Sequence, residues 1–164
     1  MNEIAARRVV SSPIGLLSIA ASEKGICSID FLSSRSKLRD FSESKKAMEH
    51  VDLACLEIED YFAARRQRFS VPLDLSGTRF QLQVWQQIAK IDFGKSVSYG
   101  TIAKAIKNPA ASRAVGGAVG ANPVPIIIPC HRVMGSTGKL TGYSGGSGIP
   151  TKKKLLALEG ISYK

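Results

Sequence analysis

The second half of this chain contains almost no acidic residues. Residues 1–78 hold 11 Lys and Arg against 11 Asp and Glu, whereas residues 79–164 hold 12 Lys and Arg against Asp92 and Glu159 alone. The excess positive charge, +10 in total, therefore lies after residue 78. Because a basic surface gains affinity for a polyanion by releasing condensed counterions, nucleic acid is the first partner to consider. A basic face that is merely solvated accounts for the charge equally well.

Cysteine and histidine are also scarce. The cysteines Cys27, Cys55 and Cys130 are odd in number and far apart in the sequence, which argues against a disulfide framework. Only His50 and His131 could join them as metal ligands, and neither a C-x-x-C nor an H-x-x-x-H spacing occurs. We therefore expect no structural metal and no cofactor.

Long hydrophobic stretches are missing as well. No apolar run approaches the ~20 residues that a membrane span needs, and the first ten residues lack the pattern of a secretory signal. We therefore expect a soluble, cytoplasmic protein without a membrane partner, associated with the nucleoid if the organism is prokaryotic. With 44% hydrophobic residues, the chain can bury a core as one compact unit or as two small lobes.

The first third of the chain has the pattern of antiparallel β-structure. Short apolar runs within residues 9–32 alternate with turn residues, which predicts a small meander. Residues 45–66 then carry apolar side chains at spacings of three and four, which predicts an amphipathic helix. Cys55 lies on this apolar stripe, so we interpret it as a packing residue. We expect an α+β protein with an N-terminal β-rich lobe over residues 1–76.

A second, mainly helical domain is expected over residues 77–164, containing the active site and the DNA-binding surface. Ser98 can cap a helix that ends near Lys107, and Asn108, followed by Pro109, can cap the next helix. Two short helices joined by a tight turn indicate a helix-turn-helix.

The second of these helices consists mostly of very small residues around Arg113. Glycine weakens a helix by roughly 1 kcal/mol relative to alanine, so the presence of Gly116 and Gly117 within a helix requires an explanation. One reason is the close approach of another molecule, and the alternative is tight packing inside the protein.

Residues 122–133 are rich in proline and isoleucine, which predicts a rigid extended segment that delivers Cys130 and His131 to a fixed place. Cysteine attacks as a thiolate, and a neighbouring imidazole can take its proton directly or through a water. A carboxylate can orient that imidazole, and Glu159 is the candidate. Taken alone, a Cys-His pair is more often a buried thiol beside an ordinary histidine.

The segment Pro129-Cys130-His131-Arg132-Val133 resembles the active-site signature of the O6-alkylguanine-DNA alkyltransferases. Further segments look like motifs of that family, in the family's order: residues 98–100, 112–118, 122–125 and 142–146. The resemblance covers about residues 80–160, and the N-terminal part fits only loosely.

The resemblance implies direct-reversal DNA repair. An alkyl group would move irreversibly from O6-alkylguanine, and also from O4-alkylthymine, to Cys130 in one turnover. The lesion would be flipped out of the duplex from the minor-groove side, because its O6 atom is unreachable while the base is stacked. His131 and Glu159 would activate the thiol, Asn122 would fix the turn that holds it, and Tyr99 would hydrogen-bond guanine N3 and help the base to leave.

The resemblance also implies contacts to the base and the duplex. The carbonyls of Cys130 and Val133 would recognise the exocyclic amine, and the Ser144 backbone would approach O6. Arg113 would replace the departed base in the stack. The other implied residues line the pocket or let the second helix enter the minor groove: Tyr143 and Pro125 for the pocket, and Ala111, Ala114 and Gly116 for the groove.

The expected partner is double-stranded DNA carrying alkylated guanine, bound by a monomer, with cooperative assembly on DNA left open. Three alternatives remain: a relative that binds lesions without repairing them, a Cys-His hydrolase, and a helix-turn-helix transcription regulator. The presence of Cys130 argues against the first alternative, and the skewed charge against the second. The third would show strong sequence preference on DNA.

Overall fold

A computed structural model describes residues 2–33 and 38–164 of the chain. These described residues form two compact units, one within residues 2–76 and one of residues 77–164. The mixture of an antiparallel sheet with helices confirms the predicted α+β class.

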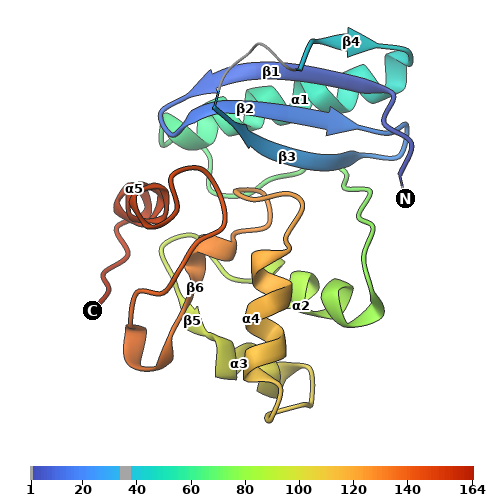
Figure 1. Ribbon diagram of the computed structural model, residues 1–164. Coiled ribbons are helices and arrows are strands. Elements are labelled where there is room, and N and C mark those ends of the chain that lie inside the picture. The colour runs from blue at the N-terminus through green and yellow to red at the C-terminus, as the bar shows by residue number, and fades with distance from the viewer. Residues whose placement is uncertain (1, 34–37) are drawn as a thin grey trace. The chain divides into compact units, whose positions relative to one another are not determined.

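The N-terminal unit is a four-stranded antiparallel sheet with one long helix (Figure 1). The strands lie in the order β3-β2-β1-β4, and helix α1 packs against the sheet. Their bounds are β1 Ala6–Ser12, β2 Gly15–Ala21, β3 Ile26–Leu32, β4 Phe41–Ser42 and α1 Lys45–Phe62. The β1–β2 hairpin closes where Ser12 pairs with Gly15, whose φ of 108° favours glycine. The short strand β4 was not predicted, because two residues carry no readable alternation.

Helix α1 ends four residues earlier than the predicted end at Arg66. Ala64 adopts a left-handed conformation with φ 59°, which stops the helix. The buried side of α1 includes Glu57, whose carboxylate accepts hydrogen bonds from the backbone of Ser70 (3.0 Å) and Val71 (2.8 Å). Cys55 is half-buried beside this face. Because the buried Glu57 is charged, apolar periodicity alone does not identify every buried position of α1.

The C-terminal unit is mainly helical and contains a two-stranded parallel pairing of β5 with β6. Its elements are α2 Arg79–Ala89, β5 Val97–Ser98, α3 Tyr99–Ala105, α4 Ser112–Gly120, the 3₁₀ turn η2 Cys130–Arg132, β6 Val133–Met134, the 3₁₀ turn η3 Ser136–Gly138, and α5 Ile149–Glu159. Helices α3 and α4 pack against each other as a helix-turn-helix pair, and α4 also packs against α2 (Figure 1). Trp85 Nε1 donates a hydrogen bond of 2.9 Å to the Ala118 carbonyl and so joins α2 to α4.

Local capping in this unit was predicted partly correctly. The Ser98 side chain caps α3, as expected. Gly160 ends α5 with φ 70°. The predicted cap at Asn108 is wrong: α4 starts at Ser112 and has no side-chain cap. Residues 108–111 instead form a turn in which the Ala111 amide donates to the Asn108 carbonyl at 3.0 Å.

The segment 122–133 is folded back on itself and not extended, so that prediction is also wrong. The Ile128 amide donates to the Val124 carbonyl at 2.9 Å, and Ile126 has φ 76°, an uncommon conformation for a β-branched residue. The isoleucines that suggested an extended strand are buried within this turn. Burial of several consecutive side chains is possible because the backbone reverses between them.

Candidate active site

Cys130 lies at the start of η2 and is 5% exposed. The folded-back turn before it is tied together by Asn122. The Asn122 amide Nδ2 donates to the Ile128 carbonyl at 2.8 Å, and its Oδ1 accepts from the Val124 amide at 3.0 Å. The Cys130 amide donates to the Ile128 carbonyl at 2.8 Å. These hydrogen bonds hold the thiol in one place.

Cys130 opens onto a cavity of about 260 Å³, somewhat smaller than the ~300 Å³ at the low end of small-molecule pockets. Tyr99 and Ser144 contribute to its wall; the Tyr99 hydroxyl hydrogen-bonds Thr141 Oγ1 at 2.8 Å, and Ser144 Oγ donates to the Gly120 carbonyl at 3.0 Å. The lining residues come from α3, α4, η2 and the loop before α5: Tyr99, Gly116, Val119, Gly120, Cys130, Gly142, Tyr143 and Ser144. Pro125 and Val133 are buried and lie within five residues of Cys130 in the sequence, but they are not among these lining residues.

Burial keeps the Cys130 thiol protonated at rest. Desolvation raises the pKa of the Cys130 thiol, whereas hydrogen bonds from Asn122 and Tyr143 and the charge of Lys152 oppose that rise. The thiolate is therefore unfavourable in the resting protein, but the groups that stabilise it already surround the sulfur.

His131 and Arg132, which follow the thiol in the sequence, form a buried cluster with Glu159 of α5. His131 Nε2 is hydrogen-bonded to Glu159 Oε2, and Arg132 Nε donates to Glu159 Oε1 at 2.7 Å. Burial lowers the pKa of His131 although Glu159 opposes this, so the imidazole is neutral at pH 7. Its Nδ1 is buried and has no hydrogen-bond partner among the described residues. A neutral imidazole with a free nitrogen lone pair is able to accept a proton.

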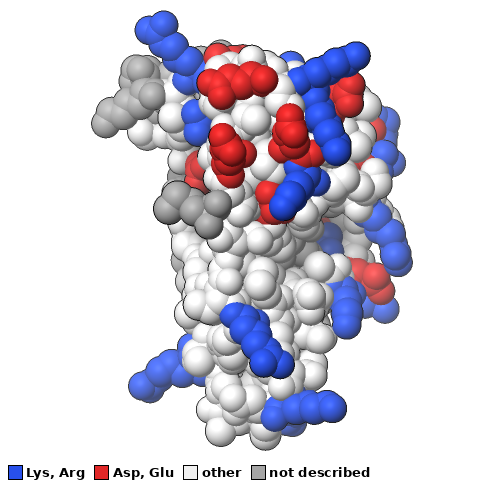
Figure 2. Space-filling view, turned by 90° about the vertical axis from the view of Figure 1, so that its right-hand side faces the viewer, with Lys and Arg blue, Asp and Glu red and all other residues white. Residues whose placement is uncertain are grey.

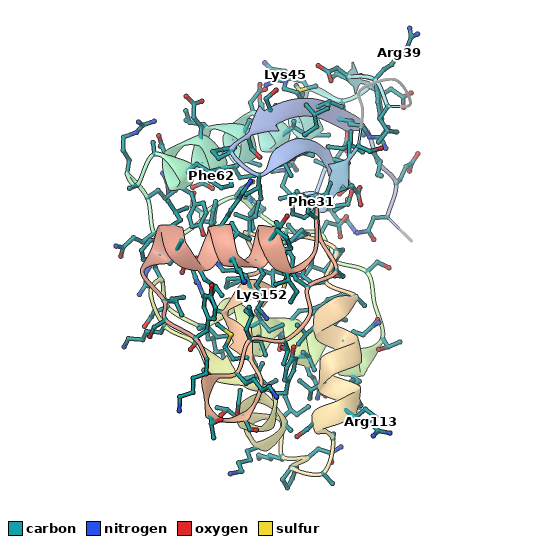
Figure 3. The ribbon with its side chains drawn as sticks, turned by 60° about the vertical axis from the view of Figure 1, so that its left-hand side comes forward. Phe31, Arg39, Lys45, Phe62, Arg113 and Lys152 are labelled. Atoms are coloured by element: carbon teal, nitrogen blue, oxygen red, sulfur yellow. The ribbon has the colours of Figure 1, made fainter. Side chains whose placement is uncertain are left out.

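Lys152 is a site residue that sequence reasoning missed. It is 1% exposed, and its ammonium donates a hydrogen bond of 2.8 Å to the Val133 carbonyl. Desolvation lowers its pKa to about 8, opposed by the attraction of Cys130. Figure 3 shows Lys152 on α5. Lys153 and Lys154 are exposed, and nothing in this run of three lysines distinguishes the buried one.

Helix α4 presents its small residues to solvent. Val115, Ala118 and Val119 are buried, whereas Arg113 and Ala114 are exposed. Figure 3 shows Arg113 near the end of α4. Ala111 and Gly116 are partly exposed.

The glycines of α4 are not required by packing within the protein. A methyl group added at Gly116 would approach the Tyr99 ring no closer than 3.9 Å, and one added at Gly117 or Gly120 would meet nothing within 4 Å. Tight internal packing therefore does not explain them.

Charge is distributed as the sequence predicted. Figure 2 shows acidic and basic side chains mixed over the N-terminal unit, while basic side chains predominate over the C-terminal unit. Within residues 2–33 and 38–164, no group of three or more His, Cys, Asp or Glu is placed to hold a metal ion. No helix in the described ranges has the length and apolarity needed to cross a membrane.

Two family models match nearly the whole chain. Residues 6–75 match the 6-O-methylguanine DNA methyltransferase, ribonuclease-like domain, and residues 79–161 match the 6-O-methylguanine DNA methyltransferase, DNA binding domain. The chain belongs to this methyltransferase family. The family assignment confirms the resemblance found in the sequence and extends it to the N-terminal unit.

Individual members of the methyltransferase family are similar over almost their full length. The chain is 43% identical over 152 residues to the methylated-DNA--protein-cysteine methyltransferase of Methanosarcina acetivorans, covering 93% of this chain and 96% of that protein. It is 43% identical over 158 residues to the constitutive methylated-DNA--protein-cysteine methyltransferase of Bacillus subtilis, covering 93% and 94%. The crystal structure of Mycobacterium tuberculosis OGT in complex with DNA has a TM-score of 0.80 and 42% identity, covering 93% and 91%.

Proposed function

We propose that this chain is a methylated-DNA-protein-cysteine methyltransferase that binds DNA and moves the alkyl group from O6-alkylguanine to Cys130. The observation that carries this proposal is the position of the thiol. It opens onto a small cavity, and the next residue is a buried, neutral histidine bonded to a carboxylate. The relatives named above carry the same activity in their names and have similar lengths.

The reaction begins with proton transfer. The thiol proton of Cys130 passes to His131, directly or through a water, as the sulfur attacks the alkyl carbon. Glu159 stabilises the imidazolium that forms, because its carboxylate is already bonded to Nε2. Asn122 and Tyr143 hydrogen-bond the developing thiolate.

A carbon–sulfur bond forms while the bond between the alkyl carbon and O6 breaks, and its electron pair stays with the base. Tyr99 donates a proton at guanine N3, so that guanine leaves as a neutral molecule. The Tyr99 phenolate regains a proton from solvent, to which the His131 imidazolium returns the proton taken from the thiol. Carbonyl groups of Cys130 and Val133 recognise the exocyclic amine, the Ser144 backbone lies near O6, and Tyr143 and Pro125 shape the pocket. Among the described residues that line the cavity, no group is able to cleave the thioether product, so each molecule reacts once.

Helix α4 is proposed to enter the minor groove. Apart from Arg113, its exposed residues are small and include Ala114, with Ala111 and Gly116 partly exposed beside it, and internal packing does not require its glycines. Such a face lets a helix backbone approach the duplex closely. Arg113 projects from the same helix and takes the place of the flipped base.

The same cavity is proposed to accept O4-alkylthymine, whose alkyl group is also carried by an exocyclic oxygen of a six-membered ring. We propose that the protein acts as a monomer on double-stranded DNA, which places it with the nucleoid in a prokaryotic cell. A plot of bound protein against protein concentration on long DNA measures whether binding is cooperative.

Intact-mass measurement tests the proposed transfer. After incubation with O6-benzylguanine, the protein should gain the mass of one benzyl group, located at Cys130 by peptide mapping. Cys27→Ser and Cys55→Ser serve as matched controls and should react normally, whereas Cys130→Ser should bind DNA normally but gain no mass. Tight lesion binding without any mass gain in the unmodified protein would identify a lesion binder instead. Repeated turnover of an acyl substrate would identify a hydrolase.

A further inference from the structure

The Glu159 carboxylate is held by more than the histidine. Its Oε1 accepts hydrogen bonds from Arg132 Nε (2.7 Å) and from the backbone amide of Gly94 (3.1 Å), while Oε2 is bonded to His131. The side chains of Glu159 and His131 are 0% exposed, and that of Arg132 is 6% exposed. The carboxylate is thus shared between a group that can lose its charge and a group that cannot.

Arg132 is itself fixed in place. Its Nη1 donates to the Ile91 carbonyl at 2.5 Å, and its guanidinium lies over the Phe93 ring, 5.8 Å from the centroid. The turn after α2 therefore holds both Arg132 and, through the Gly94 amide, Glu159. The guanidinium has little freedom to leave the carboxylate.

Burial is the largest cause of the lowered pKa of His131, and the charges beside the ring set how far that pKa is lowered. A buried carboxylate needs a positive partner, and an arginine remains charged at every pH that the protein meets. Since Arg132 already neutralises Glu159, the imidazole can donate a hydrogen bond from its Nε2–H to Glu159 while it stays uncharged. If Arg132 were absent, the carboxylate would instead favour a second proton on the imidazole, and Nδ1 would no longer be able to accept one.

We propose that Arg132 is a positioning residue that keeps His131 neutral, and therefore able to accept the Cys130 proton, by neutralising and orienting Glu159. This proposal rests on the function proposed above. It assigns to Arg132 no contact with the substrate.

Few other charges act on this cluster. The positive charge of Lys152, on α5, lowers the pKa of His131. The thiol of Cys130 precedes His131 in the chain. In the turn after α2, Asp92 and Lys95 are exposed, so their charges are screened by solvent. Among the charges around His131, those of Glu159 and Arg132 therefore act most strongly.

Direct titration of His131 tests the proposal without requiring any repair activity. The ring nitrogens are followed by NMR in a Cys130→Ser background, where no active-site thiol titrates. His50, the only other histidine, lies in the N-terminal unit and serves as an internal reference. With Arg132 present, His131 should be neutral at pH 7. In Arg132→Met its titration should move up by about one to three pH units, which is the effect of a close opposite charge.

Matched variants separate charge from packing. Arg132→Lys keeps the positive charge and should leave the titration of His131 close to that of the parent, whereas Arg132→Gln should behave like Arg132→Met. Arg66→Met removes an arginine from the buried carboxylate of Glu57 in the other unit and should leave His131 unchanged. Should one neutral variant fail to fold, the other supplies the measurement.

Alkyl-transfer rates then connect the titration to the reaction. With Cys130 intact, the acidic limb of the pH–rate profile should shift to higher pH in Arg132→Met, by the same number of pH units as the titration of His131. A lower rate with an unshifted limb and an unshifted titration would overturn the proposal, because a purely structural role predicts that result. If the unmodified protein transfers no alkyl group, the proposed function fails, while the titration still decides the role of Arg132.

Discussion

Replacing Lys152 by methionine should make the protein more stable and less reactive at neutral pH. Lys152 is 1% exposed, and the pKa of its ammonium falls from 10.5 to about 8 on folding. A shift of that size corresponds to about 3 kcal/mol of unfavourable burial, since each pKa unit is worth about 1.4 kcal/mol. The substitution removes this penalty but also removes the hydrogen bond to the Val133 carbonyl, which lowers the gain in stability by about 1–2 kcal/mol.

The pH dependence gives this prediction its sign. Because the pKa is lower in the folded protein, the unfolded chain binds more protons between about pH 8 and pH 10.5, and stability therefore rises with pH across that window. The Lys152→Met protein lacks this rise. Its advantage of about 1–2 kcal/mol at pH 7 should vanish and then reverse as the pH approaches about 10.

Urea denaturation at a series of pH values measures both effects. The comparison is made in a Cys130→Ser background, so that the thiol does not titrate in the same window. Lys153→Met, which changes an exposed neighbour, is the matched control and should show neither effect. A stability difference between Lys152→Met and its parent that stays constant with pH would refute the reasoning. In the protein with Cys130 intact, Lys152→Met should slow alkyl transfer about tenfold or more, because the thiolate loses a nearby positive charge.

Three further changes test other parts of the molecule. Arg113→Ala should slow repair of duplex DNA far more than reaction with free O6-benzylguanine, and equal losses in parallel rate assays would exclude its role in the stack. Gly116→Ala should leave the melting temperature unchanged or raise it, since the added methyl group meets nothing closer than 3.9 Å, yet weaken DNA binding in a fluorescence titration. Unchanged affinity would argue against close approach of α4 to the groove. Glu57→Gln should cost about 1–3 kcal/mol in urea denaturation, because it removes the buried charged acceptor of the Ser70 and Val71 amides and of the half-buried Arg66, whereas the exposed control Glu59→Gln should cost almost nothing.

Secondary structure was predicted well where local signals were strong. The three long strands and helix α1 follow from apolar periodicity and turn residues, which depend only on neighbours in the sequence. The failures occurred where long-range burial decided the conformation. Asn108 looked like a helix cap but lies in a turn, and Ile126 belongs to a buried reversal although its residue type favours an extended strand.

The candidate site was only partly predictable. Cys130 and His131 are adjacent, so a motif could point to them, and scarcity of acids drew attention to Glu159. The structure joins His131 and Glu159 by a hydrogen bond, although the catalytic roles assigned to them stay predictions. Arg132 was quoted within the motif but received no role, because nothing in the sequence says that it contacts the same carboxylate.

The sequence by itself determined the family of this protein, its α+β class and the concentration of positive charge in its second half, because motifs, periodicity and composition are properties of the chain. Only the tertiary structure decided which of three consecutive lysines is buried beside the thiol and which arginine neutralises Glu159. Those outcomes depend on how residues far apart in the chain share one desolvated space, where the cost of a charge is set by its neighbours in three dimensions.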